Sequence, residues 1–173
     1  MNRPTRAAPE ANGEPQPCPG CGLALPAHPG PTHPYIGASA ACWARYGELL
    51  AREYGPLNLR EGHRLSVDAY AVQHPGRPGR RAMQSVAVHL IALHLMLDHG
   101  HPPAYVTARL GPILSRLPPL HWLEPPRPNG TLTVRDVLDV EEAHHGDQVR
   151  AWAVDVWSAW RPHHATVRGW LGR

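Results

Sequence analysis

The sequence predicts an all-α protein: a single irregular helical bundle around a central apolar helix, with a zinc-knuckle loop on its N-terminal side. Segments with apolar residues at helical spacing dominate the chain, and 21 prolines and 16 glycines interrupt it too often for long regular sheets. A Cys-Pro-Gly-Cys-Gly motif begins at Cys18. The length of 173 residues favours one domain. We expect a disordered tail over residues 1–16 and one helical zinc-binding domain over residues 17–173.

The first predicted helix follows a loop that is too rich in proline and glycine to be helical, over residues 18–37. Ser39 is a suitable N-cap for a helix that ends near Tyr54. Ser66 can cap a second, short helix that ends at about Gln73, because the next residue precedes a proline and is disfavoured in the helical region.

The central helix is predicted over residues 81–98, where the sequence is apolar on nearly all sides. Residues 105–117 can form a helix that is broken around Gly111 and Pro112. Residues 118–128 read as an extended loop, and we expect its Trp122 to fill a gap in the core.

The C-terminal third is predicted to be helical as well. Thr133 and Asp136 resemble a capping box for a short helix that ends near Val140. Pro162 either kinks the long helix that follows or begins a new one. Large apolar residues recur every three or four positions along that long helix, and this stripe should pack onto the central helix. The stripe consists of Val149, Trp152, Ala153, Val156, Trp157 and Trp160.

Composition excludes several functional classes. All 17 basic residues are arginine, so a phosphate-binding loop lysine and a Schiff-base lysine are both excluded. The formal charge of +3 comes with 14 acidic residues spread along the chain, and we expect no nucleic-acid partner. No apolar run reaches the length of a membrane span, and no signal peptide is recognisable. We expect a cytoplasmic protein with reduced thiols and no membrane contact, and a small molecule or a protein as its unidentified partner.

The three cysteines predict a metal site. Cys18 and Cys21 form a knuckle, in which two thiolates separated by two residues can bind one ion. Cys42 is three positions after the expected cap Ser39, where free amides and the helix dipole favour a thiolate. Four protein ligands would make a closed, structural zinc site. Ordinary reduced thiols and a catalytic role for Cys42 are the alternatives.

The fourth ligand should be a histidine that the loop can reach. His33 lies between the knuckle and the third cysteine and is our prediction, while His28 and His74 are less favoured.

A second, catalytic site is predicted from Asp68, His74, His89 and His164. The three histidines belong to three different helices, and three imidazoles plus water would suit a catalytic zinc, iron or nickel ion. Asp68 could bind the metal or orient an imidazole, and hydrolysis is the default reaction. The alternative is that 13 histidines reflect composition and that the buried ones are satisfied by hydrogen bonds.

Two further groups are expected to be solvated. Arg77, Arg80 and Arg81 form the densest basic patch and read as an exposed loop. His144 and His145 carry no sign of a role.

Several motifs together resemble an uncharacterised bacterial family, a domain of unknown function. They are the CPGCG and HPY sequences that begin at residues 18 and 33, the segment from Ser39 to Trp43, the VDAYAVQHPG sequence over residues 67–76, and the SVAVHL sequence over residues 85–90. The resemblance extends from Cys18 to Leu171 and implies one domain. It implies no activity and carries no catalytic residue over to this chain.

Two functions are therefore in competition. The first is a helical protein with a structural zinc and a His-lined, metal-dependent pocket. The second is a non-enzymatic module that binds a protein or nucleic acid through the zinc knuckle and the Trp-rich C-terminal segment.

Overall fold

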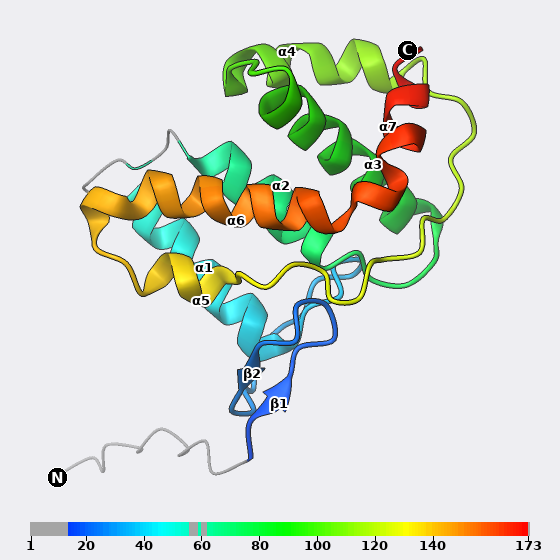
Figure 1. The fold of residues 1–173 in the computed structure, drawn as a ribbon. Coiled ribbons are helices and arrows are strands. Elements are labelled where there is room, and N and C mark those ends of the chain that lie inside the picture. The colour runs from blue at the N-terminus through cyan, green and yellow to red at the C-terminus, as the bar shows by residue number, and fades with distance from the viewer. Residues whose placement is uncertain (1–13, 56–58, 60–61, 173) are drawn as a thin grey trace, which may run out of the picture.

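A computed structural model describes residues 14–55, 59 and 62–172 of the chain (Figure 1). Most of the predicted tail lies outside these residues, but Gln16 already belongs to a strand. The elements in chain order are β1 (Gln16–Pro17), β2 (Ala24–Leu25), α1 (Ala40–Tyr54), α2 (His63–Gln73), α3 (Arg80–Leu93), the π-helical η1 (His94–Asp98), α4 (Pro103–Leu114), α5 (Val134–Leu138), the 3-10 helix η2 (Glu142–His144), α6 (His145–Ala159), the 3-10 helix η3 (Arg161–His163) and α7 (His164–Trp170).

The helices form an irregular bundle, which confirms the predicted all-α class. Helix α2 packs against both α3 and α6. Helix α1 packs against α5, and both α4 and α7 pack against α3. The β1–β2 hairpin projects from the end of the bundle where α1 begins, and the long connection from α4 to α5 runs along the outside past α7 (Figure 1). In the part of the chain that the structure describes, every helix is too short or too polar to cross a membrane.

Buried apolar side chains from the hairpin to α7 belong to one cluster. Trp152 of α6 and Trp160, the residue directly after that helix, are completely buried, and Trp152 donates its indole N–H to Gln73 Oε1 over 3.1 Å. Val86 and Leu90 of α3 are buried in the same cluster. The α6 stripe therefore packs into the core with the central helix, as the sequence predicts.

Two helices begin at the cap residues that the sequence predicts. Ser39 Oγ accepts a hydrogen bond from the Cys42 amide over 3.2 Å at the start of α1. Thr133 and Asp136 form a capping box at the start of α5. Both interactions satisfy amides that have no partner within the helix, and this is why short polar side chains at these positions mark the boundaries.

Three local predictions are wrong. Helix α2 begins at His63, and Ser66 lies inside it and donates its hydroxyl to Glu53 instead of capping. Helix α4 continues through Pro112, which lies in its last turn and so costs only one backbone hydrogen bond. Leu123, at 5% exposure, fills the core where Trp122 was expected, while the Trp122 indole lies nearer the surface and donates to Glu124.

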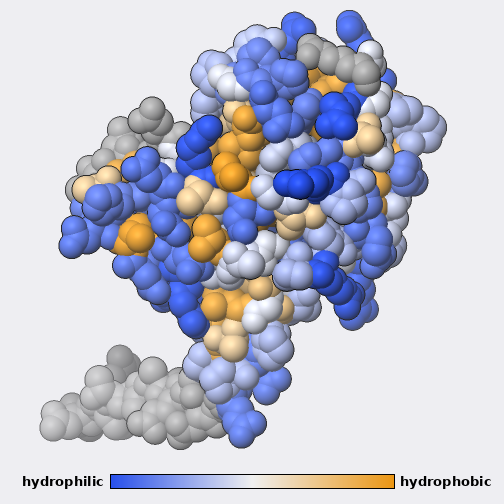
Figure 2. All heavy atoms as spheres, in the orientation of Figure 1, coloured by the Kyte–Doolittle hydropathy of each residue, from blue (hydrophilic) through white to orange (hydrophobic). Residues whose placement is uncertain are grey.

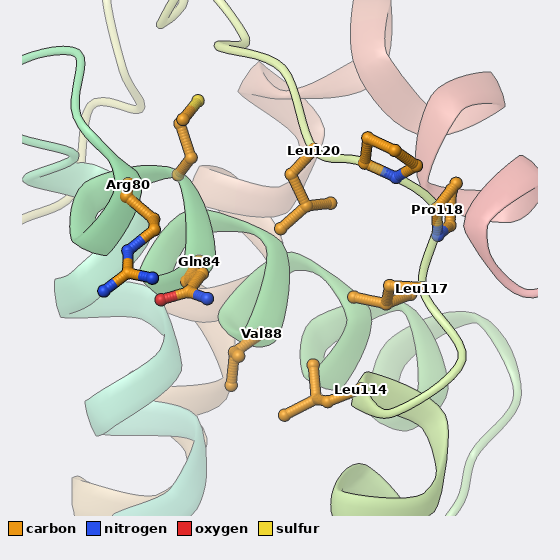
Figure 3. Close-up of a pocket in the computed structure, with 9 residues that line it drawn as sticks. Arg80, Gln84, Val88, Leu114, Leu117, Pro118 and Leu120 are labelled. Carbon is orange, nitrogen blue, oxygen red and sulfur yellow. The ribbon is translucent and has the colours of Figure 1, made fainter.

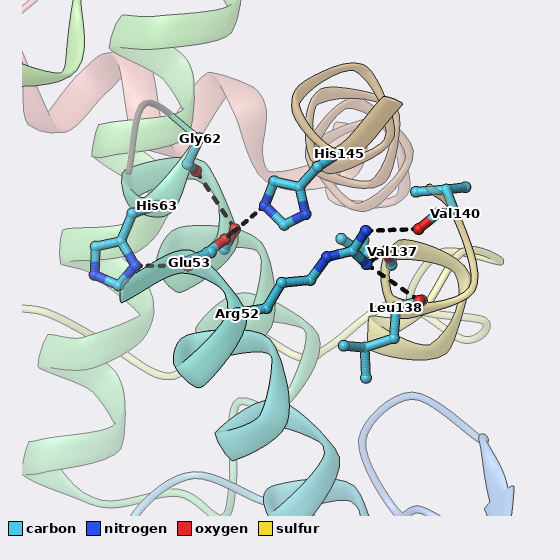
Figure 4. A network of polar contacts seen from close by, with 9 residues as sticks. Arg52, Glu53, Gly62, His63, Val137, Leu138, Val140 and His145 are labelled. Carbon is cyan, nitrogen blue, oxygen red and sulfur yellow. Dashed lines mark hydrogen bonds and ion pairs between the residues drawn. The ribbon is translucent and has the colours of Figure 1, made fainter. Parts of the chain in front are cut away.

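Glu53 of α1 has a completely buried carboxylate that contacts two histidines (Figure 4). Its Oε2 lies 2.7 Å from His63 Nδ1, and its Oε1 lies 3.3 Å from His145 Nε2. His145 was expected to be solvated but is only 1% exposed. A buried carboxylate needs hydrogen-bonding partners, and this requirement places His145 in the interior.

Candidate metal centre

The turn of the hairpin carries the first two cysteines. β1 and β2 are antiparallel, with Gln16 opposite Leu25, and Cys18 and Cys21 lie in the turn between them. The Cys18 amide donates to Leu23 O over 2.9 Å, and the Gly22 amide donates to Cys18 O over 2.8 Å. Gly22 has a φ of +75°, a conformation that favours glycine. These turn contacts hold both sulfurs on the side of the hairpin that faces the bundle.

The third sulfur comes from the first turn of α1. Cys42 is the third residue of that helix and is completely buried. The amide of Ser39, which caps the helix, donates to Cys18 Sγ over 3.4 Å and so joins the hairpin to the helix start. Cys21 Sγ and Cys42 Sγ are 3.8 Å apart.

The fourth donor is His74, the residue that ends α2. It is completely buried, and its Nε2 lies 3.4 Å from Cys42 Sγ. Its Nδ1 lies 2.7 Å from Tyr70 O, and a carbonyl partner requires the proton to be on Nδ1. In the neutral ring Nε2 is then the lone-pair nitrogen, the form in which histidine binds metals.

The four donor atoms fit one tetrahedral ion. The three sulfurs and the imidazole nitrogen all lie within 4.8 Å of one another. Zinc with bonds of about 2.3 Å to sulfur and about 2.0 Å to nitrogen gives sulfur–sulfur distances of about 3.8 Å and sulfur–nitrogen distances of about 3.5 Å. The distances of 3.8 Å and 3.4 Å in the cluster match these values.

The pKa shifts of the cysteines and the histidine in the cluster also favour a bound cation. Hydrogen bonds from Cys21 and then Cys42 lower the pKa of Cys18, while hydrogen bonding to Cys18 and then Cys21 raises the pKa of Cys42. Burial disfavours the charged imidazole of His74, but hydrogen bonds with Cys18 and Cys21 outweigh it and raise its pKa to about 9. The thiols compete for the charged form because each thiolate repels the next, and a divalent ion removes this competition.

Two glycines allow the chain to close around the cluster. A Cβ atom on Gly20 would lie 2.4 Å from His74 Cδ2. Gly76 has a φ of +76°, and its Cβ would lie 2.5 Å from Tyr35 O. The Gly37 amide donates to His74 O over 2.9 Å, which fixes the backbone of the histidine. Gly20 of the CPGCG sequence and Gly76 of the HPG sequence are therefore needed for close approach.

Replacing Gly20 with alanine should weaken metal binding, because the new methyl group would push the imidazole of His74 away from the sulfurs. We expect zinc affinity, measured by competition with a chromogenic chelator, to fall about tenfold or more, the scale on which disturbed ligand orientation acts. Gly47→Ala is the matched control: Gly47 lies within α1, and beyond the neighbouring helix backbone no atom lies within 4 Å of the added Cβ, so the zinc affinity of this variant should not change. Equal affinities for the two variants would show that the close approach to His74 is unimportant.

His33, the predicted fourth ligand, is not part of the cluster. Its ring lies edge-on to Tyr35, with centroids 4.4 Å apart, and 5.1 Å from the Trp43 ring. Aromatic packing holds the imidazole there, and burial lowers its pKa. His28 is exposed. The usable signal for His74 was its position at a helix end, directly before Pro75.

The predicted catalytic set is divided among three places, so its three histidines do not share an ion. Asp68, completely buried, accepts from Arg64 Nε and pairs with His89 Nδ1, each over 2.7 Å. His74 directs Nε2 to the cysteine cluster and Nδ1 to the Tyr70 carbonyl, so neither ring nitrogen is left for a second site. His164 stacks on Trp157, with ring centroids 3.7 Å apart, and donates to its carbonyl. Among the described residues, the only group of three or more potential metal ligands is Cys18, Cys21, Cys42 and His74.

Comparison with known proteins identifies the family of the chain but no activity. No curated protein and no solved structure matches it. A family described only as being of unknown function matches residues 16–161, a range that holds the hairpin, helices α1 to α6 and all four residues of the metal cluster. The chain therefore belongs to the family of unknown function DUF5946.

Proposed function

We propose that the protein binds one structural zinc ion through Cys18, Cys21, Cys42 and His74. The observation that carries this proposal is the convergence of four donor atoms from the hairpin, α1 and α2 within 4.8 Å. Three thiolates and one imidazole in tetrahedral positions are typical of zinc, and four protein ligands leave no open position for a substrate. The ion is thus a clamp between three elements.

The hairpin needs such a clamp. Its strands have only two residues each, and a two-stranded hairpin is at best marginally stable in water even when it is longer. No helix or strand lies between Leu25 and Ala40, so little regular structure holds this segment to the bundle. Zinc binding supplies folding free energy where the core cannot. Three free cysteines also suit a reducing compartment such as the cytoplasm.

The alternative, a binding module that uses the Trp-rich segment, has less support. Trp152 and Trp160 are completely buried and Trp157 is 5% exposed, so these side chains form core. The face shown in Figure 2 is mostly hydrophilic, with small separate apolar patches. Within the described residues, the large apolar side chains with high exposure are Tyr54, Tyr105 and Val154, which lie on three different helices.

Metal analysis of two histidine variants tests the proposal. The untagged protein should contain about one zinc per chain, since one closed site accounts for all four donors. His74→Ala should lose most of the metal or bind it at least tenfold more weakly, whereas His33→Ala should retain it. A protein that binds no zinc, or a zinc content that depends on His33 and not on His74, would contradict the proposed ligand set.

A further inference from the structure

Three adjoining pockets follow the outer face of α3. We call the first the arginine pocket; it has a volume of about 760 Å³ and is lined by Arg77, Arg80 and Arg81, together with Tyr35. The second, the histidine pocket, has about 510 Å³ and is lined by Tyr35, Arg81, Gln84, Ser85, Val88 and His89. The two share Tyr35 and Arg81, so one ligand can contact both. Their volumes lie in the range of small-molecule sites.

The third, the apolar pocket, has about 650 Å³ and lies across Gln84 and Val88 from the histidine pocket. Figure 3 shows Arg80, Gln84 and Val88 following one another along α3 on one side of this pocket, and Leu114, Leu117 and Leu120 on the opposite side. The outer face of α3 therefore offers cationic, hydrogen-bonding and apolar groups side by side.

His89 is held in one orientation at the edge of the histidine pocket. Its Nδ1 pairs with Asp68, which is completely buried and is itself held by Arg64. The other ring nitrogen, Nε2, has no hydrogen-bond partner among the described residues, and the side chain is 18% exposed. A carboxylate behind Nδ1 fixes the proton there, so Nε2 is left as a hydrogen-bond acceptor for a group in the pocket.

The arginine pocket carries positive charge that nothing in the described chain neutralises. None of the ion pairs between described residues involves Arg77, Arg80 or Arg81, and no Asp or Glu is among the described residues that line the three pockets. Guanidinium groups bind phosphate oxygens in a bidentate manner and are favoured wherever phosphate is recognised. A phosphate group is the ligand chemistry that this pocket suits best.

The spacing along α3 limits the size of the ligand. Arg81 and His89 are eight residues apart on one helix, which is about 12 Å along its axis. The long arginine side chain covers part of this span, so a phosphate bound at Arg81 leaves room for one small organic group before His89 is reached.

We propose that this face of α3 binds a small phosphate monoester. The phosphate lies in the arginine pocket, and a hydroxyl group on the organic part donates to His89 Nε2. Asp68 is a positioning residue that sets the His89 tautomer. None of the four proposed zinc ligands lines the three pockets, although Pro19, Gly37 and Gly76 beside the cluster line the arginine pocket. The proposal does not rest on the role proposed for the metal.

Calorimetric titration of the zinc-loaded, full-length protein with two probes tests the proposal. The probes are phenyl phosphate and 4-hydroxyphenyl phosphate, which differ by one hydroxyl group. We expect 4-hydroxyphenyl phosphate to bind about threefold to tenfold more tightly, the effect of one hydrogen bond. His89→Ala should make the two affinities equal while both probes still bind. If the preference persists in His89→Ala, or if neither probe binds saturably at millimolar concentration, the proposal is wrong.

A matched pair of double variants separates specific binding from net charge. Arg80→Gln/Arg81→Gln should lower the affinity for both probes about tenfold or more. Arg150→Gln/Arg161→Gln removes the same charge from exposed positions on α6 and η3 and should leave both affinities within about twofold, since distant surface charges are screened. Equal losses in the two double variants would overturn the proposal.

Three further measurements complete the test. A short oligothymidylate that bound more tightly than the monoesters, and equally well to His89→Ala, would show a nucleic-acid surface in place of a small-molecule site and would also overturn the proposal. Zinc content and helical circular dichroism should match the parent protein in all variants. Because these readouts are independent of probe binding, failure at the α3 site is distinguishable from failure of the zinc proposal.

Discussion

Removal of the zinc should lower the melting temperature of the protein by about 10 °C or more, because the loss of a few kcal/mol shifts the melting of a chain of this size by about that amount. Without the ion, two completely buried donors, Cys42 and His74, and the nearly buried Cys18 would remain close together with no cation between them. The hairpin would keep its few backbone hydrogen bonds, the hydrogen bonds from Arg135 to Ala24 O and from the Ser39 amide to Cys18 Sγ, and the contacts of Leu23 and Leu25 with the core.

Thermal melts before and after treatment with a strong chelator measure this effect, with residual zinc determined on the same samples. Hydrogen exchange should show that the amides of Cys18 and Gly22 lose protection first, while those in the middle of α6 keep theirs. Readdition of zinc should restore both properties. A protein fully depleted of metal that melted at its original temperature would rule out a structural role for the ion.

The Trp152→Ala substitution should destabilise the protein by about 3 to 5 kcal/mol, the cost of emptying a completely buried aromatic site. Trp152 is 0% exposed and lies edge-on to the Tyr70 ring, with centroids 6.4 Å apart. Its indole N–H is also a hydrogen-bond donor to Gln73 Oε1, so the variant would leave a buried amide oxygen without this donor. Urea denaturation of the zinc-loaded protein measures the change in the free energy of unfolding.

Trp122→Ala provides the comparison for this measurement. Trp122 is the same residue type but lies nearer the surface, where its indole donates to the exposed Glu124. We expect its replacement to cost about 1 kcal/mol or less, as for most surface substitutions. A loss below about 1 kcal/mol for Trp152→Ala as well would mean that α6 does not pack as the structure shows.

Features that depend on neighbouring residues could be predicted from the sequence. Ser39 and Thr133 cap the helices that follow them, because a cap is an interaction over two or three positions. The spacing of the tryptophans along α6 is enough to predict a buried face of that helix. The knuckle formed by Cys18 and Cys21 is equally local, and its position in a turn followed from the glycines around it.

The fourth metal donor could not be predicted in this way. His74 follows Cys42 by 32 positions, and the two meet only because α2 packs between α3 and α6 and ends beside the start of α1. His33 was nearer in sequence, but aromatic contacts with Tyr35 and Trp43 hold it elsewhere. His145 was misjudged for the same reason, since its partner Glu53 is more than ninety positions away.

The predicted catalytic set combines a contact between neighbouring helices with contacts that the sequence could not place. Asp68 pairs with the imidazole of His89, whereas the prediction had it bind a metal or orient a metal-ligating imidazole, and neither residue belongs to the cysteine cluster. His164 does not join Asp68, and His74 contacts the cysteines instead. Both results depend on how whole helices are placed, and residue spacing contains no information on that placement.

X-ray absorption at the zinc edge of the purified protein is the most direct test of the metal centre. We expect one ordered zinc with three sulfur neighbours at about 2.3 Å and one nitrogen neighbour at about 2.0 Å. In His74→Ala the nitrogen of an imidazole should disappear from the spectrum while the sulfur neighbours remain. A parent spectrum with fewer than three sulfur neighbours, or an imidazole signal that survives in His74→Ala, would contradict the proposed metal centre.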